Sequence, residues 1–330
     1  MAVAAGLFAV HYASSVFAPL ALALFIVALV WPLQSSLQAR MPKLLALLLV
    51  MLAIVVVFVS FASLLAWGFG RVGRSIVNDA AQLQAIYEQG RVWLEEHGIF
   101  AGVWAEHFDV RWLVRTGQQV TERLTNTLTF WLVVLVYVML ALLEVDSFKE
   151  KLQLLRNRDA GRIILQTSVL SAVRLRKYML VRTAMSVVTG LLVWAFATIA
   201  GLRFAGEWGV IAFALNYIPF IGPFFATVFP TLFALAQFGS WEATLVIFLG
   251  LNAIQFIVGS YIEPRISGSV LALSPIVVLF SVLLWTFVWG IFGAFIGVPI
   301  TIVVLAFCAH HPATRWLADL LGASREPAAS

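Results

Sequence analysis

The chain has 330 residues, of which 62% are apolar and only 11% are charged, and its formal net charge is +5. Soluble globular proteins carry about 25% charged residues, so this composition excludes a water-soluble fold and indicates a protein whose apolar surface is covered by the lipid bilayer. The basic residues are spread among apolar stretches and form no recognised binding motif, which argues against a nucleic-acid partner.

Residues 1–70 are predicted to form the N-terminal transmembrane helices. The apolar stretch 6–30 follows no charged leader and precedes no clear cleavage site, so we expect it to stay in the membrane, as one kinked span or as two shorter helices. The second stretch, 44–69, is uninterrupted. At about 1.5 Å per residue it is longer than the roughly 30 Å of hydrocarbon, so it is expected to span with some tilt.

Residues 71–127 differ in composition from the stretches on either side. Acidic and basic residues are mixed there, and apolar residues recur at helical spacing. This pattern predicts an extramembrane insert of amphipathic helices. Three tryptophans suit contact with a membrane interface or a neighbouring subunit, or serve only to hold the insert together: Trp93, Trp104 and Trp112.

Residues 128–182 are predicted to comprise one transmembrane helix and a basic cytoplasmic loop. The span covers residues 128–143, and four basic residues stand directly before the next apolar run: Arg174, Arg176, Lys177 and Arg182. Lysine and arginine are enriched in cytoplasmic loops, so this loop is placed inside the cell and the 71–127 insert, one span away, outside it. Arg40 and Lys43 then also lie on the cytoplasmic side.

Residues 183–309 are predicted to form a C-terminal transmembrane transport core. After a span at 183–200, two long apolar segments, 208–238 and 270–309, are interrupted by proline and glycine. Proline removes a backbone donor and glycine allows close backbone approach, so such breaks persist in a membrane only where protein or a wet cavity covers them. Broken helices of this kind line substrate sites in secondary transporters. The alternative is that they only kink and pack ordinary spans.

Both breaks supply candidate residues for a substrate or ion pathway. Whether the two segments are full spans or re-entrant hairpins stays open at this point. The candidates in the breaks are Asn216, Pro219, Gly222, Pro223, Gly293, Gly297 and Pro299.

Polar residues elsewhere in the core add further candidates. Asn252 and Gln255 stand three apart in one span and so near one helix face, where they would contact a pathway or hydrogen-bond a neighbouring helix. Glu263 and Arg265 flank Pro264. Together they would form an ion or proton relay, or a solvated pair at the membrane surface.

The usual sequence motifs of nucleotide-binding proteins, hydrolases and metal sites are absent. There is no P-loop, no H-E-x-x-H and no G-x-S-x-G motif, and none of the five histidines stands in a recognised metal-ligand spacing. Cys308 is the single cysteine, so no intramolecular disulfide or cysteine cluster can form. We therefore expect no enzyme activity, no cofactor and no metal. The tail, 310–330, is expected to fray.

The two broken segments carry a family resemblance. Residues 208–235 read WGVIAFALNYIPFIGPFFATVFPTLFAL, and residues 261–303 contain YIEPRISGSVLALSPIVVLFSVLLW followed by GIFGAFIGVPI. Both stretches resemble the signatures of the autoinducer-2 exporter (AI-2E) family, also called PerM-like permeases. The bulky run at residues 285–289 departs from the small residues usual in the family. The first half is similar in layout only.

The resemblance implies an all-α, polytopic membrane protein of the bacterial inner membrane, with about seven or eight transmembrane segments and a homo-oligomeric state. It implies a secondary transporter that exports a small polar solute, with autoinducer-2 as one candidate. Sodium/proton antiport is the near alternative, with Glu263 as the coupling carboxylate. A different class is a non-transporting membrane scaffold that assembles through the 71–127 insert.

Overall fold

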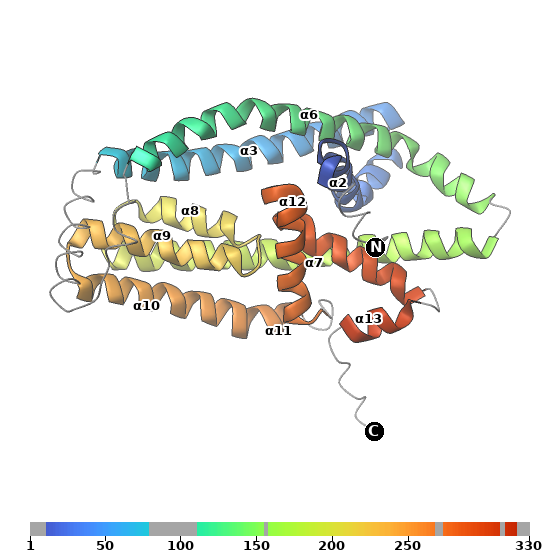
Figure 1. Ribbon diagram of the computed structural model, residues 1–330. Coiled ribbons are helices and arrows are strands. Elements are labelled where there is room, and N and C mark those ends of the chain that lie inside the picture. The colour runs from blue at the N-terminus through green and yellow to red at the C-terminus, as the bar shows by residue number, and fades with distance from the viewer. Residues whose placement is uncertain (1–10, 79–110, 155–157, 268–272, 311–313, 322–330) are drawn as a thin grey trace, which may run out of the picture.

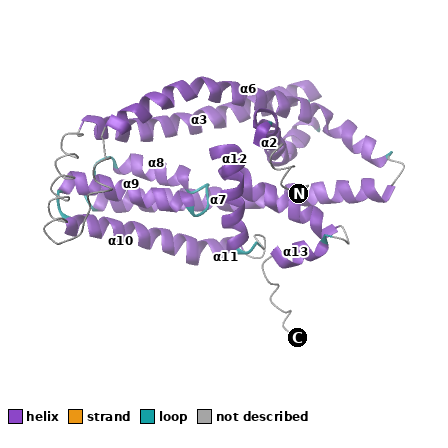
Figure 2. Ribbon diagram, viewed as in Figure 1, coloured by secondary structure: helices purple, strands orange, loops and turns teal. Residues whose placement is uncertain are grey.

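The computed structural model describes residues 11–78, 111–154, 158–267, 273–310 and 314–321 (Figure 1). Within these ranges the regular elements are helices, as Figure 2 shows. Seven of the described helices are long and apolar enough to cross a membrane. The predicted all-α, polytopic membrane fold is confirmed. Most of the predicted insert, residues 79–110, lies outside the described residues, and its two flanks belong to helices.

Four long helices make up the first part of the bundle. They are α2 (Ser14–Gln38), α3 (Lys43–Asn78), α6 (Arg111–Gln153) and α7 (Arg158–Ile199). α3 and α6 run side by side along one flank, where the rings of Phe58 and Trp131 lie 3.9 Å apart (Figure 1). The basic loop expected at residues 144–182 is instead helical, because α6 continues to Gln153 and α7 begins at Arg158. Charged residues at helical spacing, such as the Asp159–Arg162 pair at 3.2 Å, extend these helices past their apolar stretches.

Basic side chains gather where α2 ends, α3 begins and α6 ends. Lys43 Nζ donates to the carbonyl of Leu143 at 2.9 Å and lies 3.7 Å from Asp146. Lys149 Nζ sits 4.3 Å from the ring centroid of Trp31. We call this end of the bundle the basic end, and α7 also begins there (Figure 1). The contacts agree with the prediction that Lys43 and the 144–182 segment share one side.

An ion pair joins α3 to α8 (Ala205–Leu215) at the opposite end, which we call the far end. Arg71 Nη1 lies 2.8 Å from Glu207 Oε1, and the Glu207 side chain is only 6% exposed. The Arg71 guanidinium also stands 5.9 Å from the Trp67 ring and 6.0 Å from the Phe204 ring. Glu207 stands in the first turn of α8, where the helix dipole favours a negative charge.

Residues 208–238 form a helical hairpin. α8 has 11 residues, too few to span a bilayer. α9 (Ile221–Phe238) returns beside it (Figure 1). At the far end, Gln237 of α9 donates to the carbonyl of Gly201 and accepts from the amide of Arg203, both at 2.8 Å. The hairpin therefore enters and leaves on one side of the bundle.

α10 (Trp241–Ile257) follows, then a π-helical turn (Val258–Ile262), α11 (Glu263–Ser267) and α12 (Pro275–His310). α12 is a second hairpin, because its backbone breaks at Trp289 (φ −130°, ψ 16°) and Gly290 (φ 63°, ψ −142°). Ser281 Oγ of the first arm donates to the carbonyl of Gly297 in the second at 2.7 Å. The amide of Ser274, just before α12, donates to the carbonyl of Leu321 in α13 (Arg315–Leu321) at 3.5 Å, so α13 returns to the start of the first arm.

Glycine permits both hairpins to close. A Cβ at Gly222 would overlap the carbonyl oxygen of Leu215, and one at Gly293 would overlap that of Trp285. At each site the two arms approach backbone to backbone, which only a residue without Cβ allows. The sequence left full spans and re-entrant hairpins open for these segments. In the structure each segment folds back on itself, and α9 and α12 also count among the seven helices long and apolar enough to cross a membrane.

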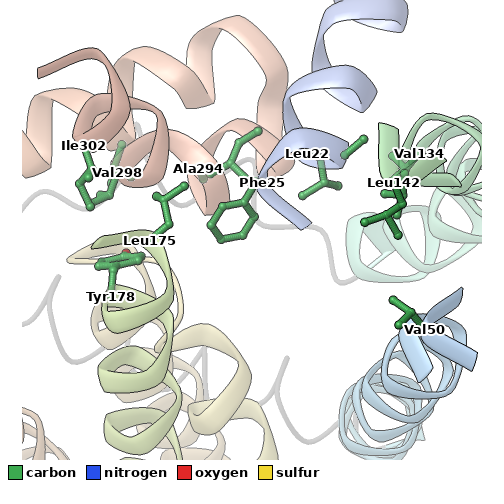
Figure 3. Close-up of a cluster of buried hydrophobic side chains, with 14 of the residues drawn as sticks. Leu22, Phe25, Val50, Val134, Leu142, Leu175, Tyr178, Ala294, Val298 and Ile302 are labelled. Atoms are coloured by element: carbon green, nitrogen blue, oxygen red, sulfur yellow. The ribbon is translucent and has the colours of Figure 1, made fainter. Parts of the chain in front are cut away.

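The main hydrophobic core joins the second hairpin to the first half of the chain. α2, α3, α6, α7 and α12 all contribute, as Figure 3 shows. Its members include Leu22, Phe25, Val50, Val134, Leu142, Leu175, Tyr178, Ala294, Val298 and Ile302. Apolar packing against α2, α3, α6 and α7 thus holds the α12 hairpin in place.

The Arg71–Glu207 pair yields a stability prediction. Arg71→Met should lower the free energy of unfolding by about 2 kcal/mol, because Glu207 would remain buried without its partner while half-exposed Arg71 weakens the effect. Thermal unfolding in detergent measures this. Exposed Arg74→Met on the same helix is the control, and Arg71→Met combined with Glu207→Gln should recover most of the loss. Equal melting temperatures for the two single variants would contradict the prediction.

Candidate functional site

The turn of the α8–α9 hairpin docks on α7 through two polar contacts. Asn216 is buried, and its Nδ2 donates to Ser186 Oγ at 3.4 Å. Tyr217 OH donates to Thr183 Oγ1 at 3.1 Å. Thr183 and Ser186 stand three residues apart, so neighbouring positions on the α7 surface hold the hairpin turn.

The same turn contacts the second hairpin. The ring of Tyr217 lies 6.0 Å from that of Phe295 in the second arm of α12. Ile218 and Ile221 pack against the core cluster that contains Ala294 and Ile296. The two breaks predicted from the sequence, 74 residues apart at 216 and 290, thus come together in space.

The backbone of the first turn is strained. Phe220 adopts φ 62° and ψ −54°, a region that a bulky side chain rarely enters and that costs on the order of 1–3 kcal/mol. Pro219, directly before it, is buried, and its carbonyl accepts from the Ile221 amide at 2.7 Å. Such strain persists only where the surroundings fix the turn, and it is frequent at ligand sites.

A partly buried ion pair lies on α7 about one helical turn before the Asn216 contact. Arg182 Nη1 of α7 approaches both carboxylate oxygens of Glu263, at 3.2 and 3.3 Å, with side chains 9% and 24% exposed. The guanidinium carbon also lies 6.0 Å from the Tyr178 ring. Because Arg182 directly precedes Thr183, this pair and the Tyr217 contact occupy adjacent positions on α7.

A π-helical turn precedes Glu263 in the chain. It covers Val258–Ile262, and Val258 packs in a small cluster with Val181 and Met185 of α7. A π-turn changes the helical phase of the residues that follow it and often marks functional sites. Here it stands directly before the carboxylate that meets Arg182.

The partner of Glu263 was not foreseen. The sequence suggested Arg265, but that residue is exposed, its guanidinium lies 5.8 Å from the Tyr261 ring, and Pro264 beside it is exposed as well. The sequence places Arg182 in a basic loop, whereas the structure has it buried on helix α7. The helical phase of Arg182 is the sequence signal that indicates an inward-pointing side chain. At about 100° per residue it shares a face with Thr189 and not with Arg176 or Lys177.

The two amides of α10 do not act as a pair. Asn252 is exposed and its Nδ2 donates to the carbonyl of Phe248 at 2.8 Å. Gln255 is partly buried, and its Nε2 has no partner among the described residues. The buried residues Ile247 and Leu251 define the inner face of α10, and Asn252 stands at its edge. The expectation that both amides face inward therefore holds for Gln255 only.

The other candidates lie in the hairpins. Gly222 is buried in the first turn, and the carbonyl of Pro223 accepts from Thr227 Oγ1 at 3.0 Å. Gly293, Gly297 and Pro299 are buried in the second arm of α12. Within the described ranges, no group of three histidine, cysteine, aspartate or glutamate residues could hold a metal ion.

Comparison with known proteins identifies the family of the chain. Residues 1–313 match the family described as AI-2E family transporter. The chain belongs to the AI-2E transporter family. It is 32% identical over 299 residues to the AI-2 transport protein TqsA of Escherichia coli K12, an alignment that covers 89% of this chain and 86% of that protein.

Two further relatives align over shorter stretches. The putative transport protein YhhT of Escherichia coli K12 is 36% identical over 45% of this chain and 42% of its own length. A putative transport protein of Borreliella burgdorferi is 34% identical over 39% of this chain and 36% of its own length. Family membership and the seven candidate spans make this chain a multi-pass membrane transporter of the AI-2E type.

Proposed function

We propose that this transporter exports a small polar solute across the bacterial inner membrane, with autoinducer-2 as the first substrate to test. The observation that carries the proposal is the meeting of two helical hairpins on α7, about one helical turn from the partly buried Arg182–Glu263 pair. Discontinuous helices that converge on one site are the arrangement by which many secondary transporters hold a substrate.

The two hairpins have opposite orientations, which supports alternating access. The ends of the α8–α9 hairpin lie at the far end, as the Gln237 contacts require. In the second arm of α12, Val298 and Ile302 pack in one cluster with Leu175 and Tyr178, in the half of α7 nearer the basic end (Figure 3). Each hairpin can then gate the site from a different side of the membrane.

The charge balance at the site favours a polar solute over a bare cation. A coupling carboxylate for sodium or protons must be able to lose its partner, and Glu263 is held by Arg182 at 3.2 and 3.3 Å. Amide and hydroxyl groups lie within about one helical turn of Arg182 along α7, where Asn216 meets Ser186 and Tyr217 meets Thr183. Such groups bind oxygenated solutes without transforming them, so we infer transport without catalysis.

Orientation and environment follow from the distribution of charged and apolar groups. The basic end faces the cytoplasm under the positive-inside rule. The lipid bilayer and further copies of the chain cover exposed apolar side chains such as Leu48, Val57 and Phe287. We infer a homo-oligomer in the inner membrane.

Flux into proteoliposomes tests the proposal. Autoinducer-2 uptake is measured with sodium and proton gradients imposed in turn, for wild type, Asn216→Ala and Glu263→Gln. We expect both variants to lose at least tenfold in flux, because each removes a polar contact at the meeting point of the hairpins. Asn252→Ala makes the same chemical change at an exposed site and should keep wild-type flux.

Other results would overturn the proposal. Equal flux for Asn216→Ala and Asn252→Ala would place the pathway elsewhere. Cation exchange that is lost only in Glu263→Gln would favour the sodium/proton antiporter. No flux of solute or cation from folded, oligomeric protein would favour a membrane scaffold.

A further inference from the structure

A histidine just before α2 contacts the turn of the second hairpin. His11 Nδ1 lies 2.9 Å from the carbonyl oxygen of Val288, the last residue before the break in α12. The imidazole ring also stacks on Phe287, with ring centroids 5.8 Å apart and an interplanar angle of 14°. One side chain thus holds two successive residues of the turn, across 277 positions of the sequence.

The hydrogen bond from His11 caps a helix end. A carbonyl oxygen can only accept, so Nδ1 of His11 carries the hydrogen and donates it to Val288. The last carbonyls of a helix lack partners within that helix, and the backbone leaves helical geometry at Trp289 and Gly290. Histidine near a helix C-terminus satisfies such carbonyls, so His11 stabilises the end of the first arm.

The two arms of this hairpin pack closely beside the turn. A Cβ at Gly293 would overlap the carbonyl oxygen of Trp285, and the rings of Trp285 and Trp289 lie 4.7 Å apart. The arms are therefore in contact through both backbone and side chains. A displacement of the turn has to carry both arms with it.

α2 also contacts the second arm, and α2 and α12 lie beside each other in Figure 1. The ring of Phe25 stands 6.3 Å from that of Phe295, which in turn stands 6.0 Å from Tyr217 of the first hairpin. Apolar ring contacts allow sliding, whereas a hydrogen bond requires one distance and one direction. The bond from His11 therefore sets the position in which Phe295 meets Tyr217.

We propose that His11 is a positioning residue that latches the turn of the second hairpin to the start of α2, and that the latch opens when the transporter changes state. The inference rests on the proposed transport function, in which this hairpin gates the site. The closed latch keeps Phe295 against Tyr217 at the meeting point of the hairpins. Its release frees the hairpin to move as one body.

Electron paramagnetic resonance tests the latch without transport. In a Cys308→Ser background, spin labels are placed at Ile291→Cys, 69% exposed just past the break, and at Leu48→Cys, 61% exposed on α3. Labelled chain is diluted with unlabelled chain, so that distances between copies do not contribute. We expect one narrow distance distribution with His11 present and a distribution at least twice as wide in His11→Ala.

Two substitutions separate the hydrogen bond from the ring contact. His11→Asn keeps an N–H donor near the position of Nδ1 without the ring, and it should retain the narrow distribution. His11→Phe keeps the ring without the donor, and it should widen the distribution as His11→Ala does. Equal widths for wild type and His11→Ala, or for the asparagine and phenylalanine variants, would overturn the proposal.

Cross-linking tests whether the latch must open. In the Cys308→Ser background, His11→Cys and Phe287→Cys are joined by a short bifunctional methanethiosulfonate, and autoinducer-2 flux is measured in proteoliposomes. We expect cross-linking to lower flux at least tenfold, reduction to restore it, and each single cysteine variant to keep the flux that it had before treatment. Full flux in cross-linked protein would overturn the opening of the latch. Donor-dependent distances without any flux in wild-type protein would defeat the proposed function and leave the latch standing.

Discussion

Arg182→Met is expected to abolish transport and to lower the free energy of unfolding by about 2–3 kcal/mol. Methionine keeps much of the length of the side chain and removes the guanidinium that holds both carboxylate oxygens of Glu263. The Glu263 carboxylate is 24% exposed, so it would keep only part of its hydration and would lose its partner, which is why breaking the pair is more harmful than removing both charges. Thermal unfolding in detergent and flux in proteoliposomes measure the two effects.

Two further variants separate stability from function. Arg174→Met makes the same change at an exposed position of α7 and should leave both readouts near wild type. Arg182→Met combined with Glu263→Gln removes both charges and should recover most of the stability while transport stays lost. If Arg182→Met unfolds at the temperature of Arg174→Met, the ion pair contributes nothing measurable and the prediction is wrong.

The helices and the family could be predicted because their signals are local. Long apolar stretches determine the spans, and the Asn216–Pro223 and Gly290–Pro299 motifs determine the breaks and carry the resemblance. From the sequence, the hairpins were one of two alternatives, the other being full spans. Their closure depends on backbone contacts between arms, such as that between Gly222 and Leu215, which no local pattern encodes.

The ion pairs were missed for a different reason. Arg182 and Glu263 are 81 residues apart, and Arg71 and Glu207 are 136 apart. A charged residue at the end of an apolar stretch marks the membrane boundary in the sequence. That signal is the same whether its side chain points to water or into the bundle. Helical phase distinguishes the two orientations for Arg182. It does not name the partner, because that depends on how α10 and the π-turn pack on α7.

Substitution of Gly293 in the second hairpin is the other change for which we expect a large loss of stability and transport. Gly293→Val should lower the free energy of unfolding by at least about 3 kcal/mol and abolish transport. A Cβ at this position overlaps the carbonyl oxygen of Trp285 in the opposite arm, so the two arms must move apart. Because the obstacle is backbone, no change of rotamer relieves it.

Controls distinguish backbone overlap from general crowding. Gly73→Val adds the same side chain on α3 at a glycine whose Cβ would meet nothing within 4 Å, and it should unfold near the wild-type temperature. Trp285→Ala should not rescue Gly293→Val, since the overlapping atom belongs to the main chain. The same truncation should partly rescue Gly297→Ala, because it removes Trp285 Cδ1, 3.2 Å from the new Cβ, although the Ser281 carbonyl oxygen at 3.0 Å and Trp285 Cβ at 3.1 Å remain. Equal rescue of both variants would mean that side-chain crowding, and not contact between the two backbones, limits how closely the arms of α12 pack.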